Sequence, residues 1–166
     1  MKRYAAMILA LLLALTTAGC MAPAAQEMQE HACNEAALET PEATAGSDWG
    51  ITLSAKDVTP TGLTLVIAQS GGAPSGTLQF GSSFQLSVLA DGVWSDVPYS
   101  VDADSVAWTA EAYIVAMEDS AEYSITWEAI YGALPAGVYR ICKEFQDFRA
   151  PGDYDTESCW AEFEII

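Results

Sequence analysis

The segment Leu134-Pro135-Ala136-Gly137-Val138-Tyr139-Arg140-Ile141 decides the fold of this 166-residue chain. Gly137 permits a bend, so Tyr139 stands near the start of a strand and its hydroxyl can bond back to the preceding loop. Leu134 is expected to pack beneath the tyrosine ring. This arrangement, the tyrosine corner, is typical of the penultimate strand of two-sheet β-sandwiches, so it is informative about fold and not about function.

From Trp49 onward, β-branched and aromatic residues alternate with polar ones and are separated by Gly, Pro and Asp turns. Asp91-Gly92 indicates a tight hairpin, because both central residues of such a turn need positive φ. No long stretch has a helical period. The expected strands are residues 51–55, 63–69, 77–80, 84–88, 93–99, 122–127, 138–145 and 158–165. Seven or eight short strands favour an all-β, immunoglobulin-like or fibronectin III-like β-sandwich.

The first twenty residues have the pattern of an export signal, with a basic start and an unbroken apolar run from Met7 to Leu15. That run is short for a membrane-spanning helix. The small residues before Cys20 resemble the lipobox of bacterial lipoproteins, although Thr17 stands where Leu is usual. We expect a signal peptide at 1–19 and lipid on the Cys20 thiol, which would anchor the protein at the extracytoplasmic face of the cell membrane. An ordinary signal peptide with an incidental Cys is the alternative.

Residues 20–48 are rich in Ala, Gln, Glu, Pro and Thr and contain no Lys or Arg. Such a segment is expected to form a disordered acidic linker, which leaves 49–166 as the folded domain. The chain has 6 Lys and Arg against 23 Asp and Glu, and loss of Lys2 and Arg3 with the signal takes the net charge from −17 to −19. This charge opposes binding to nucleic acid and to anionic lipid, so the lipid anchor alone would reach the membrane.

Cys33, Cys142 and Cys159 remain if Cys20 carries lipid, and an exported compartment permits disulfides. Cys142 and Cys159 lie in the last two expected strands and are the first candidates for a bridge. The apolar residues around Cys142 place it outward, whereas those around Cys159 place it inward, and a disulfide needs convergent side chains. A β-bulge would restore the phase, and pairing of Cys33 with either residue is the other option.

His31 is the only histidine and lies in the linker. A Ser-His-Asp or Cys-His arrangement therefore lacks a positioned base, and we expect no enzyme.

Acidic residues are concentrated in the expected final loop, 146–157. They are Asp147, Asp153, Asp155 and Glu157. Calcium takes several oxygen ligands from loops of this kind, so these carboxylates form a candidate calcium site. The alternative is a solvated loop whose acids bond locally, with Arg149 as a partner.

The tryptophans divide into expected core residues and expected surface residues. Trp127 follows the inward phase of its strand, and Trp108 is also expected in the core. Trp94 directly follows the tight turn and Trp160 is out of phase with its neighbours, so these two are the candidates for an exposed aromatic binding surface. Packing across a sheet is the alternative.

Several short motifs are spread over residues 50–165. They include Gly50-Ile51-Thr52-Leu53, Val58-Thr59-Pro60-Thr61-Gly62-Leu63, Gln69-Ser70-Gly71-Gly72, Trp108-Thr109-Ala110-Glu111-Ala112, Tyr139-Arg140-Ile141 and Pro151-Gly152-Asp153-Tyr154-Asp155. Together they resemble a largely uncharacterised family of bacterial Ig-like domains found in Firmicutes lipoproteins. The resemblance implies an exported β-sandwich and carries over no catalytic residues.

These features favour a lipid-anchored, non-catalytic module for binding or adhesion at the cell envelope. Its partner would be an envelope or host protein or a glycan, recognised through Trp94, Trp160 or the 146–157 loop. The alternative is a calcium-stabilised carbohydrate-binding or inhibitor-like module, and a structural spacer is a third option.

Overall fold

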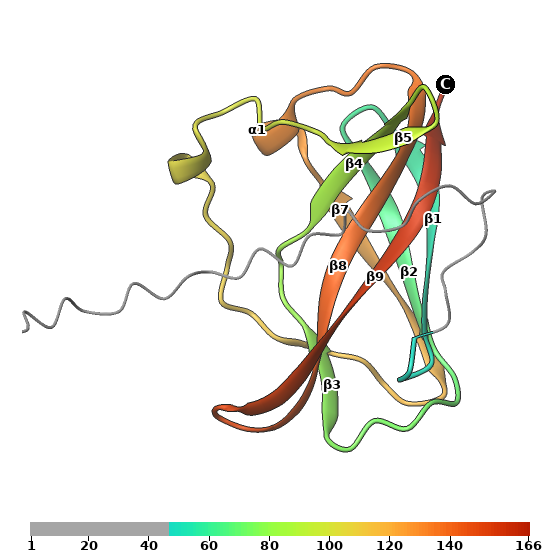
Figure 1. Ribbon diagram of the computed structural model, residues 1–166, viewed down its shortest axis with the longest axis vertical. Coiled ribbons are helices and arrows are strands. Elements are labelled where there is room, and N and C mark those ends of the chain that lie inside the picture. Colours follow the sequence, from blue (N-terminus) through green and yellow to red (C-terminus); the bar gives the residue numbers. More distant parts are fainter. Residues whose placement is uncertain (1–46) are drawn as a thin grey trace, which may run out of the picture. The chain divides into compact units, whose positions relative to one another are not determined.

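The computed structural model describes residues 47–166, and most of its regular structure is β-strand (Figure 1). The predicted signal peptide, Cys20, His31 and Cys33 lie outside the described residues. The elements in chain order are β1 (Ile51–Thr59), β2 (Gly62–Gln69), β3 (Thr77–Phe80), β4 (Gln85–Ala90), β5 (Val93–Asp96), a 3-10 turn (Ala103–Ser105), β6 (Tyr113–Ile114), β7 (Asp119–Thr126), the short helix α1 (Glu128–Tyr131), β8 (Gly137–Ala150) and β9 (Asp153–Ile165). The predicted all-β sandwich is confirmed, with about nine strands in the described part in place of seven or eight.

The strands form two antiparallel sheets. The three-stranded sheet has the order β1-β2-β7. In the six-stranded sheet, β8 pairs with β9 along one edge and with both β4 and β3 along the other. β5 extends β4, and β6 extends β3. Because β4 and β3 meet β8 at different points along its length, residues 81–84 between them leave the ladder opposite the middle of β8.

The hydrophobic core lies between the two sheets and is supplied by alternate residues of the strands. Leu65 and Ile67 of β2 and Ile141 and Phe145 of β8 belong to one buried cluster. Burial of each such side chain contributes roughly 1.5–3 kcal/mol of transfer free energy. Trp127, directly after β7, is fully buried as predicted, and its indole N–H donates to the Pro60 carbonyl over 2.9 Å.

The tyrosine corner predicted from the sequence is present. The Tyr139 hydroxyl donates to the Pro135 carbonyl oxygen over 3.0 Å, and the ring stacks on Phe163 with centroids 5.7 Å apart. The hairpin signal is also confirmed: Asp91 (φ 54°) and Gly92 (φ 78°) turn β4 into β5. The tyrosine corner thus fixes the start of β8, and the turn fixes the ends of β4 and β5 that it joins.

The β8–β9 hairpin is longer than predicted. The sequence analysis assigned residues 146–157 to a loop, but β8 runs to Ala150 and β9 starts at Asp153, so Pro151 and Gly152 alone form the turn. The tip of this hairpin extends away from the body of the sandwich (Figure 1). Its strands have no core to face there, so their side chains lack the apolar alternation by which strands are recognised.

The sandwich is closed on one side and open on the other. β1 packs against β9 on the closed side, whereas within residues 47–166 β7 has no strand partner on its outer edge. The main-chain N–H of Trp127 donates to the Thr61 carbonyl of the β1–β2 turn over 2.9 Å, so Trp127 bonds inward, toward β2. Because inward and outward hydrogen-bonding groups alternate along an antiparallel strand, the main-chain groups of Ser124 and Thr126 point to the open edge.

None of the helical turns within residues 47–166 has the length and apolar character that a bilayer span requires.

Candidate functional site

The two tryptophans nominated from the sequence do not form an exposed platform. Trp94 on β5 is partly buried, and the guanidinium of Arg140 lies over its ring, 4.8 Å from the centroid. Trp160 on β9 is also partly buried and is the register partner of Cys142. Neither tryptophan is fully exposed, and a binding surface at these two residues stays a prediction. For Trp94 the physical reason for partial burial is packing across the sheet under a cation.

Asp147, one of the four candidate calcium ligands, is enclosed by hydrogen-bond donors. Its carboxylate accepts from the main-chain N–H and the hydroxyl of Ser75, both over 2.7 Å, and from the N–H of Gly76 over 2.6 Å. Burial opposes its ionisation, but these hydrogen bonds outweigh burial and hold the pKa of Asp147 below its usual value. Asp147 thus joins the β2–β3 loop to β8.

The other three acids of that segment also have partners of their own. Arg149 donates to Asp153 over 2.8 Å and contacts Asp155 at 2.9 Å. Glu157 accepts from the Ser47 hydroxyl over 2.8 Å. Within residues 47–166 no three His, Cys, Asp or Glu side chains converge as metal ligands would. The observed contacts match the local hydrogen-bonding alternative with Arg149 as a partner.

The predicted Cys142–Cys159 bridge is wrong. Cys159 is a free, buried cysteine, whereas Cys142 is disulfide-bonded and so not to Cys159. The strands pair without a bulge at this point, with Cys142 opposite Trp160 and Lys143 opposite Cys159, so the two cysteines project to opposite faces. Burial raises the pKa of the Cys159 thiol to about 12, which makes it a poor nucleophile.

A hollow of about 250 Å³ lies beside the open edge of β7. Its walls come from both sheets and from the segments that join β3 to β4 and β5 to β6. The side chains that give it its character are Phe80, Phe84, Trp108, Tyr113, Tyr123 and Lys143. The hydroxyl residues Ser82, Ser124 and Thr126 also line it, so the hollow combines flat rings with hydrogen-bonding groups.

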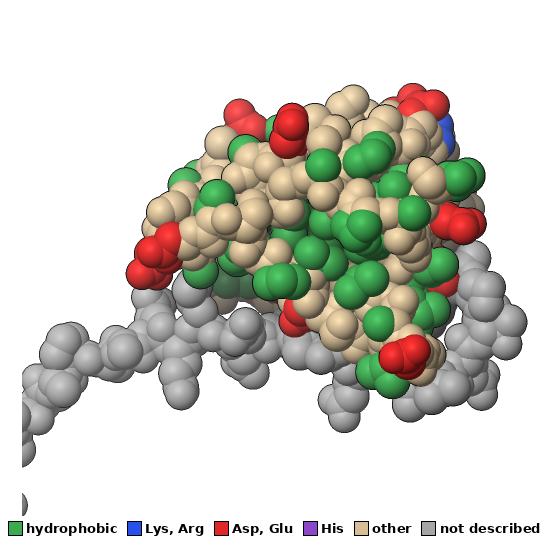
Figure 2. Space-filling view, turned by 90° about the horizontal axis from the view of Figure 1, so that it is seen from above, with side chains coloured by type: hydrophobic (Ala, Val, Ile, Leu, Met, Phe, Trp, Pro, Cys, Tyr) green, Lys and Arg blue, Asp and Glu red, His purple; other side chains and the backbone are tan. Residues whose placement is uncertain are grey.

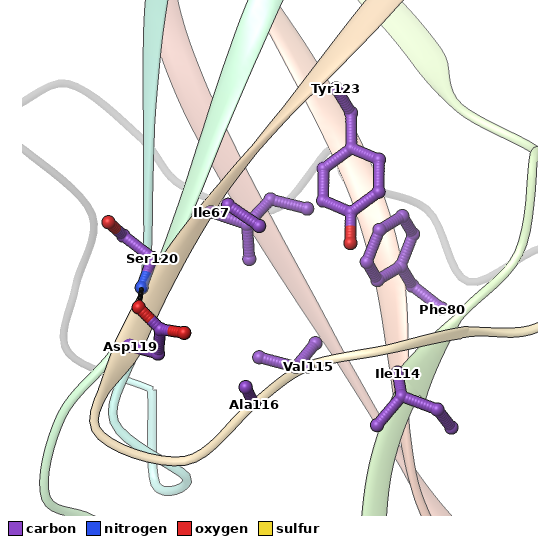
Figure 3. A pocket seen from close by; sticks show the side chains of 9 residues that line it. Ile67, Phe80, Ile114, Val115, Ala116, Asp119, Ser120 and Tyr123 are labelled. Carbon is purple, nitrogen blue, oxygen red and sulfur yellow. Dashed lines mark hydrogen bonds between the residues drawn. The ribbon is translucent and has the colours of Figure 1, made fainter.

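A smaller pocket of about 50 Å³ adjoins this hollow, because Phe80 and Tyr123 line both. Figure 3 shows Ile67 and Tyr123 on one side of the small pocket, with Val115 and Ile114 approaching from the segment around β6. The side chains that line the pocket are apolar apart from Asp119 and Ser120 at the start of β7 and the hydroxyl of Tyr123. The small pocket therefore adds a mostly apolar surface next to the hollow.

The rings around the hollow support one another. The Phe80 ring meets Tyr123 edge-on, with ring centroids 4.8 Å apart, and stacks on Tyr113 with centroids 5.3 Å apart. The Phe84 ring meets Trp108 edge-on, with centroids 5.1 Å apart. Phe80 is buried, whereas the other four rings are partly exposed. Contacts of this kind hold rings in one orientation and contribute about 0.5–1.5 kcal/mol per pair. The result is a preorganised aromatic surface open to solvent.

Lys143 is the cation of this site. It lies on the inward face of β8 and is only 4% exposed. Its ammonium donates to the carbonyls of Gly81 and Ser83, each over 2.9 Å, and lies 5.0 Å from the centre of the Phe80 ring. Burial lowers the pKa of Lys143 to about 8. The ammonium thus donates to carbonyls that have no strand partner, because the chain between β3 and β4 leaves the six-stranded sheet there.

Sequence reasoning missed this site for two reasons. Trp108 was expected in the core, but it lies in the irregular segment between β5 and β6, where no strand alternation predicts burial. Lys143 did carry a readable signal, because it shares the inward phase of Tyr139, Ile141 and Phe145. A lysine at a core-facing position of a strand is rarely buried without a specific partner.

Another exposed apolar area covers the end of the domain that carries α1 and the β4–β5 hairpin. Figure 2 shows hydrophobic side chains across the middle of this end and acidic ones around its margin. Val93 of the β4–β5 hairpin and Val101, which follows β5, are exposed aliphatic side chains, at 62% and 41%. Aliphatic side chains give little directional recognition, so the ring-lined hollow is the stronger candidate site.

A family model described as bacterial Ig-like domain matches residues 47–164, nearly all of the described chain. The chain belongs to the bacterial Ig-like domain family. No curated protein and no solved structure gives a significant match. Bacterial Ig-like domains are typically non-catalytic, and no catalytic family matches this chain. Membership suggests a surface or binding module, for which the hollow is the candidate contact.

Proposed function

We propose that this Ig-like chain is an exported, lipid-anchored, non-catalytic module that binds an envelope or host protein or a glycan. The observation that carries the binding role is the preorganised aromatic hollow at the open edge of β7. Partly exposed rings with hydroxyl groups beside them are typical of recognition sites and offer no nucleophile with a positioned base. The partner therefore meets a rigid sandwich that needs no rearrangement to bind.

Support for the lipid anchor comes from the sequence. A basic start, an apolar run and small residues precede Cys20. The acidic segment that follows would hold the domain away from the membrane, and the excess of acids would keep it off anionic lipid. Metabolic labelling with an alkyne fatty acid tests this directly. We expect incorporation in the unaltered protein and none in Cys20→Ser, whereas Cys159→Ser, a buried cysteine, should keep the label.

The binding role is tested by comparing two tryptophans on opposite faces of the six-stranded sheet. We expect Trp108→Ala to lose binding to arrayed glycans or purified envelope proteins, because Trp108 lines the hollow. Trp94→Ala is the matched control, because Trp94 packs under Arg140 on the outer face. Loss of binding in Trp94→Ala alone would move the site to that face and contradict the assignment of the hollow.

A further inference from the structure

The hollow contains a buried cation that no acid of the described domain, residues 47–166, neutralises. Lys143 lines the hollow and is 4% exposed, and no carboxylate within residues 47–166 lies within ion-pair distance of its ammonium. An ammonium has three protons, and the carbonyls of Gly81 and Ser83 accept two of them. The third hydrogen bond and the opposite charge remain to be supplied.

This lack of a counter-charge is unusual for the chain. The exposed Lys56 pairs with Glu122 at 2.6 Å, and Arg149 pairs with acids of the β8–β9 hairpin. The protein carries 23 Asp and Glu, so acids are plentiful, yet none within residues 47–166 forms an ion pair with Lys143. Burying an uncompensated charge costs free energy. Charge complementarity therefore calls for an anionic group in the hollow.

The shape and lining of the hollow indicate what would carry that anionic group. Its volume of about 250 Å³ is below the usual range of about 300–1,000 Å³ for drug-sized ligands, so it suits a single ring-sized group. The partly exposed rings of Trp108 and Phe84 can contact the C–H face of a sugar ring. The hydroxyls of Ser124 and Thr126 and their outward main-chain groups can bond its hydroxyls. A purely aromatic acid would leave these polar groups unused.

We propose that the hollow binds one carboxylate-bearing sugar residue, a hexuronic acid, of a glycan. The sugar carboxylate accepts a hydrogen bond from the Lys143 ammonium, and the sugar ring lies against the aromatic wall. This proposal rests on the binding role proposed above and specifies its ligand class. An extended acidic peptide is less well suited, because the exposed Glu111, whose carboxylate accepts from the Tyr113 hydroxyl beside the hollow, would repel its other charges.

The experiment is a titration of the purified protein with methyl galacturonoside, methyl glucuronoside and their neutral counterparts, methyl galactoside and methyl glucoside. The Trp108 indole signal is followed by NMR. We expect the uronosides to bind about 10- to 100-fold more tightly than the neutral sugars, because a charge-assisted hydrogen bond is lost with the carboxylate. Lys143→Met should lose this preference. Lys56→Met, which removes an exposed cation outside the hollow, should keep it.

Each other outcome is decisive. Equal binding of neutral sugars and uronosides would overturn the carboxylate proposal while leaving a binding module at the hollow. A shift of Trp108 by an acidic peptide and by no sugar would overturn the glycan class. Absence of any response of Trp108 to the uronosides would also overturn it. If Lys143→Met does not fold, the comparison of charged and neutral sugars on the unaltered protein still decides. The proposed function itself fails only if partners bind Trp108→Ala as they bind the unaltered protein.

Discussion

Lys143 shows how one inward-facing side chain couples protonation to folding. Its pKa falls from the ordinary 10.5 to about 8 on burial. Between these pH values the unfolded chain holds a proton that the folded chain has released, so this group's contribution to stability rises with pH. Relative to Lys143→Met, we expect the free energy of unfolding to rise by up to about 3 kcal/mol from pH 8 to pH 10.5.

Urea denaturation at several pH values measures this difference. Lys56→Met is the control, because Lys56 is exposed and its hydrogen bond to Glu122 raises its pKa instead of lowering it. Relative to Lys56→Met, the unaltered protein should therefore show no rise in the free energy of unfolding in the same pH window. A flat difference curve for Lys143→Met between pH 8 and pH 10.5 would show that the ammonium is not desolvated by folding.

The two described cysteines should differ sharply in chemistry. Cys159 is a free thiol, buried, with a pKa of about 12, so iodoacetamide at pH 8 should modify it only after unfolding. Cys142 should react only after reduction, because it is disulfide-bonded. If Cys20 carries lipid, Cys33 is the cysteine left to pair with Cys142. A peptide map without reduction checks this, and a Cys142–Cys159 cross-link would contradict it.

At the scale of strands and turns, the sequence predicted the features that depend on nearby residues, namely the inward face of a strand and the position of a tight turn. The inward phase of β8 at Tyr139 and Ile141 and the turn at Asp91 are observed as expected. The hollow could not be predicted in this way, because it forms where β3 and β4 part opposite Lys143. That parting is a matter of register between strands distant in sequence, to which no local pattern corresponds.

Two glycines with similar backbone angles separate strain from steric exclusion. Gly72 (φ 70°) and Gly92 (φ 78°) both have positive φ, but a Cβ on Gly92 would meet nothing within 4 Å. A Cβ on Gly72 would lie 2.2 Å from the Trp49 carbonyl carbon. We expect Gly92→Ala to cost about 1–2 kcal/mol of backbone strain, and Gly72→Ala to cost clearly more because main chain must move.

Chemical denaturation measures both glycine variants. Gly81→Ala is the control, because Gly81 has no positive φ and a Cβ there would make only ordinary contacts, the nearest at 3.8 Å. Its stability should stay close to that of the unaltered protein. Equal losses in Gly72→Ala and Gly92→Ala would mean that the contact between the β2–β3 loop and the start of the domain does not constrain position 72.

At the scale of the whole molecule, charge is distributed in two different ways. The tip of the β8–β9 hairpin concentrates acids around the cation Arg149, whereas the cation Lys143 is buried between the sheets with no ion-pair partner within residues 47–166. The first arrangement is neutralised within the chain, and the second is open to a ligand. An external cation therefore has little to gain at the hairpin, although the acid-rich sequence there first indicated calcium.

This distribution predicts how the protein responds to calcium. At fixed ionic strength, we expect the same thermal midpoint with calcium and with EDTA, because Arg149 already pairs with Asp153 and Asp155, and donors enclose Asp147. Only an ion that binds the folded state raises the midpoint. Arg149→Met should lower the midpoint and make it rise with added salt, because the three carboxylates then repel one another. A rise with calcium in the unaltered protein would show that the ion displaces Arg149, and the tip would then be a metal site after all.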